Sequence, residues 1–338
     1  MKSRDFTKTG PVAMVAHACV LVVVVCLLGA AVSHAATDEA DSPLTVYVAV
    51  GVLDVDEISS ADQRFTINYF AQFRWVDSRL AHDGPGTIRR DITDITAPRF
   101  LILNQQKVWS SLLNVVDITP EGEAVFRQRL WGDFSQPLRL HDFPFDKHTF
   151  ELPMVSFGGL EQQVIMAPDP QRSSLIADNL SVADWRILGY QTEVREIPLT
   201  NDVSVQGFVF SFEAERIFTH YVVKYIIPLF LIVMMSWVVF WIDPTEAGSQ
   251  LSVAVTATLT LIAYHIALAG KLPDIPYLTR MDLFLFCSTL LVFVALVEVV
   301  LTSRLARSDR VELARQYDFY SRMVFPAAYL AAAAWALL

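Results

Sequence analysis

The chain has 338 residues, of which 53% are hydrophobic and 18% are charged. Its mean hydropathy of +0.39 is too high for a soluble protein of this length and predicts several membrane spans. The formal net charge of −10 at pH 7 argues against nucleic acid as a partner and suits an attraction for cations.

The N-terminus has the pattern of an export signal. Three basic residues precede an apolar run over residues 12–32, and the small residues of 33–36 follow it. This order predicts a signal peptide over residues 1–36, with an uncleaved membrane anchor as the alternative. The mature chain would keep Cys287 as its one cysteine, so the exported domain must fold without a disulfide.

Residues 37–216 show the alternation of β-strands. Apolar side chains occupy every second position of 44–52, 65–75 and 208–214, and Ser211 falls on the opposite, water-facing side of the last run. Glycine, proline and asparagine turn signals separate the runs. Many short strands without a helical pattern predict an all-β, immunoglobulin-like sandwich.

Four apolar segments follow the sandwich and predict a four-helix transmembrane domain over residues 217–338. The linker before the last segment is rich in arginine, which keeps such a loop in the cytoplasm and leaves the sandwich on the opposite side of the membrane. The expected spans are about 220–242, 248–270, 279–302 and 319–338.

The second span is more polar than a lipid-facing anchor. Helical steps of three and four residues define a stripe that is hydroxylated at one end, aliphatic further on, and free of charge. Copies of this helix around an axis would line a pore, whereas a single helix would use the same hydroxyls to bond its own backbone or its neighbours. The stripe consists of Ser252, Thr256, Leu259, Ala263, Ile266 and Gly270.

Six motifs in order resemble the bacterial pentameric ligand-gated ion channels, relatives of the Cys-loop receptors. The resemblance covers about residues 43–338. The loop over residues 140–150, which contains the motif FPFD, lacks the two cysteines that close it in the animal receptors. The motifs are Trp75 with Asp77, FPFD at 143–146, Arg216 twelve residues before Pro228, SWVVFW at 236–241, LPDIPY at 272–277 and VALVEV at 294–299.

The resemblance implies a homopentamer in membrane lipid with the second span around the pore. Leu259 and Ile266 would then form a hydrophobic gate, and Glu246 would stand at the cytoplasmic mouth, where carboxylates favour permeant cations. Coupling between sandwich and helices would pass through the FPFD loop, Arg216 and the LPDIPY linker, with a further acid from residues 54–62. The coupling residues are Phe143, Pro144, Asp146, Arg216, Pro273 and Pro276.

The agonist is an unidentified small molecule or the proton. Phe157, Tyr190 and Trp131 are the aromatic residues that a ligand cage could use, and each also fits an ordinary core position. Four histidines are candidates for pH modulation, and protonation beside basic residues predicts opening at neutral or alkaline pH unless an aspartate pairs with the charged ring. They are His141, His148, His220 and His265.

No pattern for catalysis, a metal or a cofactor is present in the sequence. The leading hypothesis is therefore a ligand-gated, cation-selective channel and not an enzyme. The alternative is a membrane-anchored periplasmic sensor without a pore, which would need the sandwich and the spans but not the polar stripe.

Overall fold

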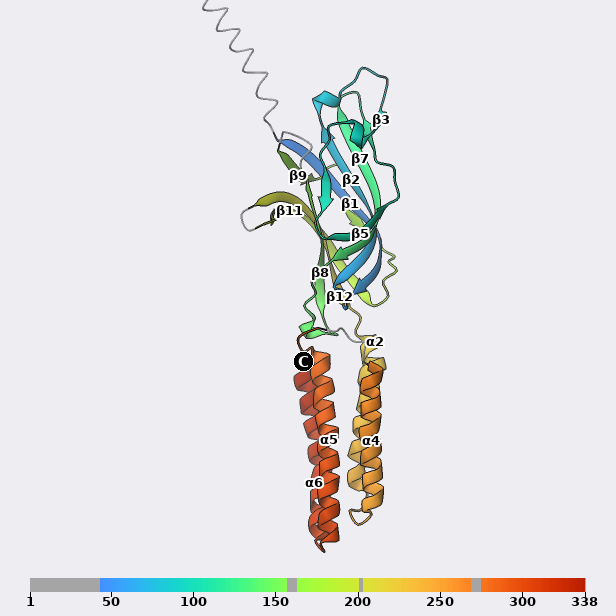
Figure 1. The fold of residues 1–338 in the computed structure, drawn as a ribbon, viewed down its shortest axis with the longest axis vertical. Helices are drawn as coiled ribbons and strands as arrows, with labels where there is room; N and C mark the ends of the chain where they lie inside the picture. The colour runs from blue at the N-terminus through green and yellow to red at the C-terminus, as the bar shows by residue number, and fades with distance from the viewer. Residues whose placement is uncertain (1–42, 157–162, 201–202, 269–274, 338) are drawn as a thin grey trace, which may run out of the picture.

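The computed structural model describes residues 43–156, 163–200, 203–268 and 275–337. A strand-built domain stands above a bundle of long helices (Figure 1). This is the predicted architecture of a β-sandwich followed by a helical membrane domain. The expected signal peptide lies outside the described residues.

The larger sheet contains eight strands in the order β10-β1-β2-β7-β6-β3, with β9 and β5 paired off this path to β1 and β7. β1 pairs antiparallel with β2 and parallel with both β9 and β10, while β2 continues through β7 and β6 to β3, and β5 also pairs with β7. The strands are β1 (Leu44–Ser59), β2 (Arg64–Val76), β3 (Ile88–Asp91), β5 (Gln105–Ser110), β6 (Val115–Ile118), β7 (Glu123–Ser135), β9 (Val164–Pro168) and β10 (Leu175–Ile176).

The smaller sheet has the strand order β11-β12-β8-β4 and packs against the larger one. Its strands are β4 (Phe100–Ile102), β8 (Lys147–Ser156), β11 (Trp185–Pro198) and β12 (Ser204–Arg216), and short 3-10 turns occupy Ser78–Leu80, Ile92–Asp94 and Leu140–Asp142.

Aromatic side chains from both sheets fill the core between them. Phe65 of β2 lies 5.2 Å from Phe150 and 5.8 Å from Phe212 between ring centroids, and both partners belong to the smaller sheet. The predicted alternation therefore places the apolar residues of these strands in the core. The expectation for Ser211 was wrong: the residue is 3% exposed, and it lies on the central strand β12 between Gln191 of β11 and Glu151 of β8, which are larger.

Four helical segments form the lower domain. The first contains α2 (Thr219–Tyr221), a π turn at Val222–Ile226, α3 (Ile227–Val238) and a 3-10 turn at Val239–Trp241; the others are α4 (Ala247–Leu268), α5 (Arg280–Arg307) and α6 (Val311–Leu337).

Three of these segments are long and apolar enough to cross a membrane: Thr219–Trp241, Ala247–Leu268 and Arg280–Arg307. The helix α6 is as long, but charged residues occupy its first turns, so a fourth span at 319–338 stays a prediction. The chain runs down through α3, up through α4, down through α5 and back up through α6 to the C-terminus near the domain junction (Figure 1).

Candidate functional site

The predicted stripe lies on one exposed face of α4. All five members that the structure describes are exposed in the single chain, including Leu259 at 60% and Ile266 at 71%. The opposite face carries Ala254, Ala257 and Leu261, which are buried where α4 packs against α3 and α5. The stripe residues therefore lie on the unpacked face of α4, and these small and aliphatic residues lie on the packed face, as helical periodicity requires. The sixth member, Gly270, lies outside the described residues.

The hydroxyl groups of α4 also bond to their own helix. Thr256 donates to the carbonyl oxygen of Ser252 at 2.7 Å, and Thr260 donates to that of Thr256 at 2.8 Å. This is the alternative that the sequence left open, and it holds for these side chains. These bonds do not bury the hydroxyl groups, because Ser252, Thr256 and Thr260 all remain exposed. Each hydroxyl oxygen thus keeps a free lone pair toward the open face.

Two carboxylates stand at the turn between α3 and α4. Asp243 accepts hydrogen bonds from Thr245 and from Arg315 of α6, and these bonds hold its pKa at about 2. Glu246 is exposed and makes no ion pair within the described part of the chain. Of the two, Glu246 is the carboxylate whose charge is left to act on ions.

At the domain junction, Arg216 is the centre of a buried polar cluster. Its Nε and Nη2 atoms donate to the two oxygens of Asp146 at 2.7 and 2.9 Å, a bidentate pair with both side chains at most 2% exposed. Nη2 also donates to Ser60 at 2.7 Å, and Nη1 donates to Tyr221 at 3.3 Å. His148 bonds to Asp146 at 2.8 Å. The predicted pairing of Asp146 with Arg216 is present.

The pair is held in its charged form. Burial by itself raises the pKa of Asp146, but the hydrogen bonds from His148 and Arg216 and the guanidinium charge outweigh it and bring the pKa to about 2. Burial likewise lowers the pKa of Arg216, and Asp146 more than offsets it. No acid from residues 54–62 reaches Arg216; the hydroxyl of Ser60 takes that place.

Aromatic rings enclose the same guanidinium. Its central carbon lies 4.2 Å from the ring centroid of Trp185 and 4.9 Å from that of Phe143, which packs edge-on against Tyr221 at 4.9 Å. Cation–π contacts of this kind gain strength when desolvated. The FPFD loop, with a cis bond between Phe143 and Pro144, therefore touches the sandwich and the first helical segment together.

Tyr277, at the end of LPDIPY, is a contact residue that the sequence reasoning missed. Its hydroxyl accepts from the backbone N–H of Leu140 at 3.0 Å, and its ring stacks on His141 at 4.2 Å. The sequence could have indicated this contact, because Tyr277 is the last residue of the LPDIPY motif and a tyrosine can pack its ring while its hydroxyl forms a hydrogen bond. Pro276 beside it is exposed, and Pro273 lies outside the described residues.

Two further links join the FPFD loop to the start of α5. The backbone N–H of Met281 donates to the carbonyl of Phe143 at 3.2 Å, and Arg280 pairs with Asp142 at 2.9 Å. The loop thus contacts the helices before and after α4.

The four histidines occupy different surroundings. The side chain of His148 is 9% exposed and lies against Asp146, whereas His141 and His220 are exposed and pack on the rings of Tyr277 and Tyr221. His265 bonds through Nε2 to the hydroxyl of Thr289 on α5 at 2.8 Å, so it points between helices and not along the stripe. Of the four histidines, His148 alone belongs to the buried polar cluster around Arg216.

Two of the three predicted ligand residues, Trp131 and Tyr190, lie on different sheets of the chain. Trp131 lies on the outer face of the larger sheet, stacked on Trp109 at 5.0 Å and bonded to Asp56. Tyr190 lies on β11 of the smaller sheet, stacked on Phe210. Trp131 and Tyr190 are 44% and 48% exposed, so neither is a core residue. Phe157 is outside the described residues.

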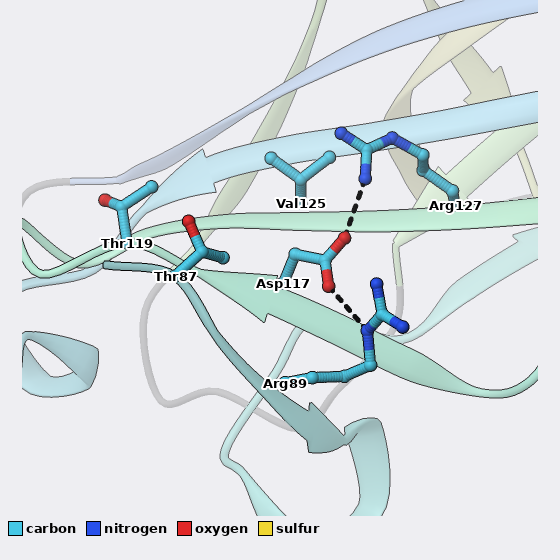
Figure 2. Close-up of a pocket in the computed structure, with 6 residues that line it drawn as sticks. All are labelled: Thr87, Arg89, Asp117, Thr119, Val125 and Arg127. Carbon is cyan, nitrogen blue, oxygen red and sulfur yellow. Dashed lines mark hydrogen bonds and ion pairs between the residues drawn. The ribbon is translucent and has the colours of Figure 1, made fainter. Parts of the chain in front are cut away.

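A separate pocket of about 450 Å³ opens on the larger sheet. Figure 2 shows Asp117 between the guanidiniums of Arg89 and Arg127, each 2.8 Å away. Both arginines keep N–H groups that Asp117 does not use, so the pocket can hold a carboxylate or a phosphate. The lining residues are Thr87, Arg89, Asp117, Thr119, Val125 and Arg127.

Comparison with known proteins assigns both domains of the chain to one family. The neurotransmitter-gated ion-channel ligand binding domain matches residues 33–216, and the neurotransmitter-gated ion-channel transmembrane region matches residues 225–312. The chain belongs to the neurotransmitter-gated ion-channel family. This is a family of membrane-spanning ligand-gated channels and not of enzymes, and it agrees with the resemblance inferred from the motifs.

Individual relatives come from bacteria and animals. A proton-gated ion channel of Gloeobacter violaceus is 24% identical over 298 residues, which are 87% of this chain and 82% of that protein. The gamma-aminobutyric acid receptor subunit beta-4 of Gallus gallus is 26% identical over 77% of this chain, and a beta-like subunit of Drosophila melanogaster is 26% identical over 76%. The aligned region spans 55% of each receptor subunit.

Proposed function

We propose that this chain forms a homopentameric, cation-selective channel whose pore is lined by α4. The observation that carries the proposal is the unpacked face of α4, where five stripe residues lie exposed opposite a packed face. Five copies around an axis would turn these faces toward one another. The hydroxyls would then line the path near Ser252 and Thr256, and the aliphatic side chains would close it by dewetting.

Recording from the purified protein in a planar lipid bilayer tests this proposal. A stimulus-dependent current, together with a native mass of five chains in mild detergent, is the expected result. A stimulus that binds without any current would favour the alternative of a sensor without a pore. A mass of one or two chains with no larger species would rule out the pentamer.

Cation selectivity rests on Glu246. Its carboxylate is exposed at the end of the bundle away from the sandwich, whereas Asp243 beside it is neutralised by Arg315. The reversal potential in a salt gradient measures selectivity directly. Glu246→Gln is expected to reduce the preference for cations, and Glu312→Gln, an exposed acid on α6, is the matched control that leaves it unchanged.

The stimulus acts from the sandwich side and reaches α4 through the junction. Arg216 and Asp146 join the end of β12 to the FPFD loop, and the loop contacts Tyr277 and Met281 on the far side of α4. A small movement of the sandwich would therefore shift both segments that flank the pore helix. The arginine-rich α5–α6 turn supports an orientation with this turn in the cytoplasm and the sandwich in the periplasm, outside a bacterial inner membrane.

The ligand site lies between sandwiches of adjacent subunits. Trp131 and Tyr190 are exposed on different sheets of one chain, and neighbouring copies in a ring would bring such faces together. The names of the relatives, a proton-gated channel and gamma-aminobutyric acid receptor subunits, support either a proton or a small molecule as stimulus. The arginine pocket of Figure 2 makes small carboxylates the first compounds to screen.

A further inference from the structure

A buried polar contact links α6 to the beginning of α4, at the end of the bundle away from the sandwich. Gln250 is 0% exposed and Asp318 is 1% exposed. The amide nitrogen of Gln250 donates to the carbonyl oxygen of Ile242 at 2.9 Å and to Oδ2 of Asp318 at 3.2 Å. One side chain of the pore helix thus holds both the preceding turn and α6.

Two oxygens in this contact lack a donor. Oε1 of Gln250 and Oδ1 of Asp318 are buried and accept no hydrogen bond within the described residues. Rotating the amide does not help, because Oε1 would then face the carbonyl of Ile242 and the carboxylate. Thr302 of α5 lies beside Asp318, but its hydroxyl donates to the carbonyl of Val299 at 3.2 Å. A buried acceptor without a donor destabilises the fold.

Arg322 of α6 is a cation whose charge favours an ionised Asp318, but its guanidinium makes its contacts elsewhere. Arg322 follows Asp318 by one helical turn, but its Nε donates to the carbonyl of Phe240 at 2.9 Å and its guanidinium lies over the ring of Trp241 at 5.4 Å. No ion pair within 4.0 Å joins Asp318 to any basic group that the structure describes. A charged Asp318 would therefore be buried without a counter-ion in contact, which is costly.

The other charged groups around Asp318 add negative charge or are already neutralised. Arg315, on the same helix, pairs with Asp243 of the α3–α4 turn at 2.9 Å. Glu298 of α5 also faces Asp318 and accepts a hydrogen bond from Ser321. The carboxylates Asp243 and Glu298 both disfavour a negative charge at Asp318.

We propose that Asp318 binds a proton in this conformation and that the neutral carboxyl pairs with the Gln250 amide. The carboxyl O–H donates to Oε1 of Gln250 while the amide N–H donates to the carboxyl, so one proton satisfies both oxygens. A carboxylic acid and a primary amide are complementary in this way, since each offers one donor and one acceptor. The pair ties α6 to α4 two residues before Ser252.

Infrared spectroscopy of the purified full-length protein tests the proposal. A protonated carboxyl has a carbonyl stretching band that a carboxylate lacks, and the band shifts when the solvent is exchanged for D₂O. At pH 5, Asp318→Asn is expected to remove one such band. Asp243→Asn is the matched control: this acid lies at the same end of the bundle but is paired with Arg315, so its loss should remove no band.

A second variant tests the partner. Gln250→Leu removes the amide and should shift the Asp318 band to higher wavenumber, because the carboxyl carbonyl loses its donor. An unchanged carboxyl region in Asp318→Asn would overturn the proposal and leave an ionised Asp318 whose donor is bound water. An unshifted band in Gln250→Leu would refute the pairing. Neither measurement needs an ion current, so the result is independent of whether the protein conducts.

Discussion

Replacing Asp146 by asparagine tests the junction cluster, because the substitution keeps the shape of the side chain and removes its charge. Folding lowers the pKa of Asp146 from 3.8 to about 2. A depressed pKa contributes stability above the unfolded value of 3.8, and that stability is lost as the pH falls toward 2. At about 1.4 kcal/mol per unit, the charge stabilises each subunit by about 2 kcal/mol at pH 7 and by about 1 kcal/mol at pH 3.

The assay is equilibrium unfolding of the detergent-purified protein, followed by tryptophan fluorescence between about pH 3 and pH 7. Trp185 lies 4.2 Å from the guanidinium of Arg216, so the cluster carries its own fluorescent reporter. The free-energy difference between the parent and Asp146→Asn should be about 2 kcal/mol at pH 7 and should shrink by about half at pH 3.

A difference that stays constant from pH 7 to pH 3 would refute this reasoning, because it would assign the cost to packing and not to charge. His148→Gln serves as the control. Glutamine still offers a donor to Asp146 and leaves the pairing with Arg216 intact, so the pH dependence of unfolding should remain.

The remaining predictions concern gating. Leu259→Ser should make the channel leaky or easier to activate, because a hydroxyl wets a dewetted constriction. Leu290→Ser, which changes an exposed leucine of α5, should conduct as the parent does. Parental currents in Leu259→Ser would place Leu259 outside the pore. Tyr277→Phe should weaken the coupling between the sandwich and the helices by about 1 kcal/mol, because it removes the hydroxyl that accepts from Leu140. The stimulus needed for half-activation should then shift by roughly fivefold. A parental dose response would remove the Leu140 contact from the mechanism. Currents recorded from about pH 5 to pH 9 should vary in the parent and vary less in His148→Gln than in His220→Gln; equal profiles in the two variants would exclude the junction histidine as the pH sensor.

Local patterns were sufficient where one periodicity decides the outcome. Alternation in 65–75 places Phe65 and its neighbours in the core, and steps of three and four place Leu259 and Ile266 on one face of α4. Both depend only on the geometry of a single strand or helix, which the sequence carries directly. The order of six short motifs was likewise enough to identify the family.

The tertiary structure decided which distant groups meet. The sequence predicted the pairing of Asp146 with Arg216, but it could not identify Ser60 as a further partner. Several acids occur within residues 54–62, and each was as plausible a partner for a guanidinium as the hydroxyl of Ser60. Nor could it place Tyr277 under Leu140, or Gln250 against Asp318, which are 137 and 68 residues apart. Such contacts depend on how whole helices, strands and loops pack. The sequence around a polar residue does not show whether its partner is water or a buried group. Periodicity therefore determined the faces of this protein, and packing determined the partners.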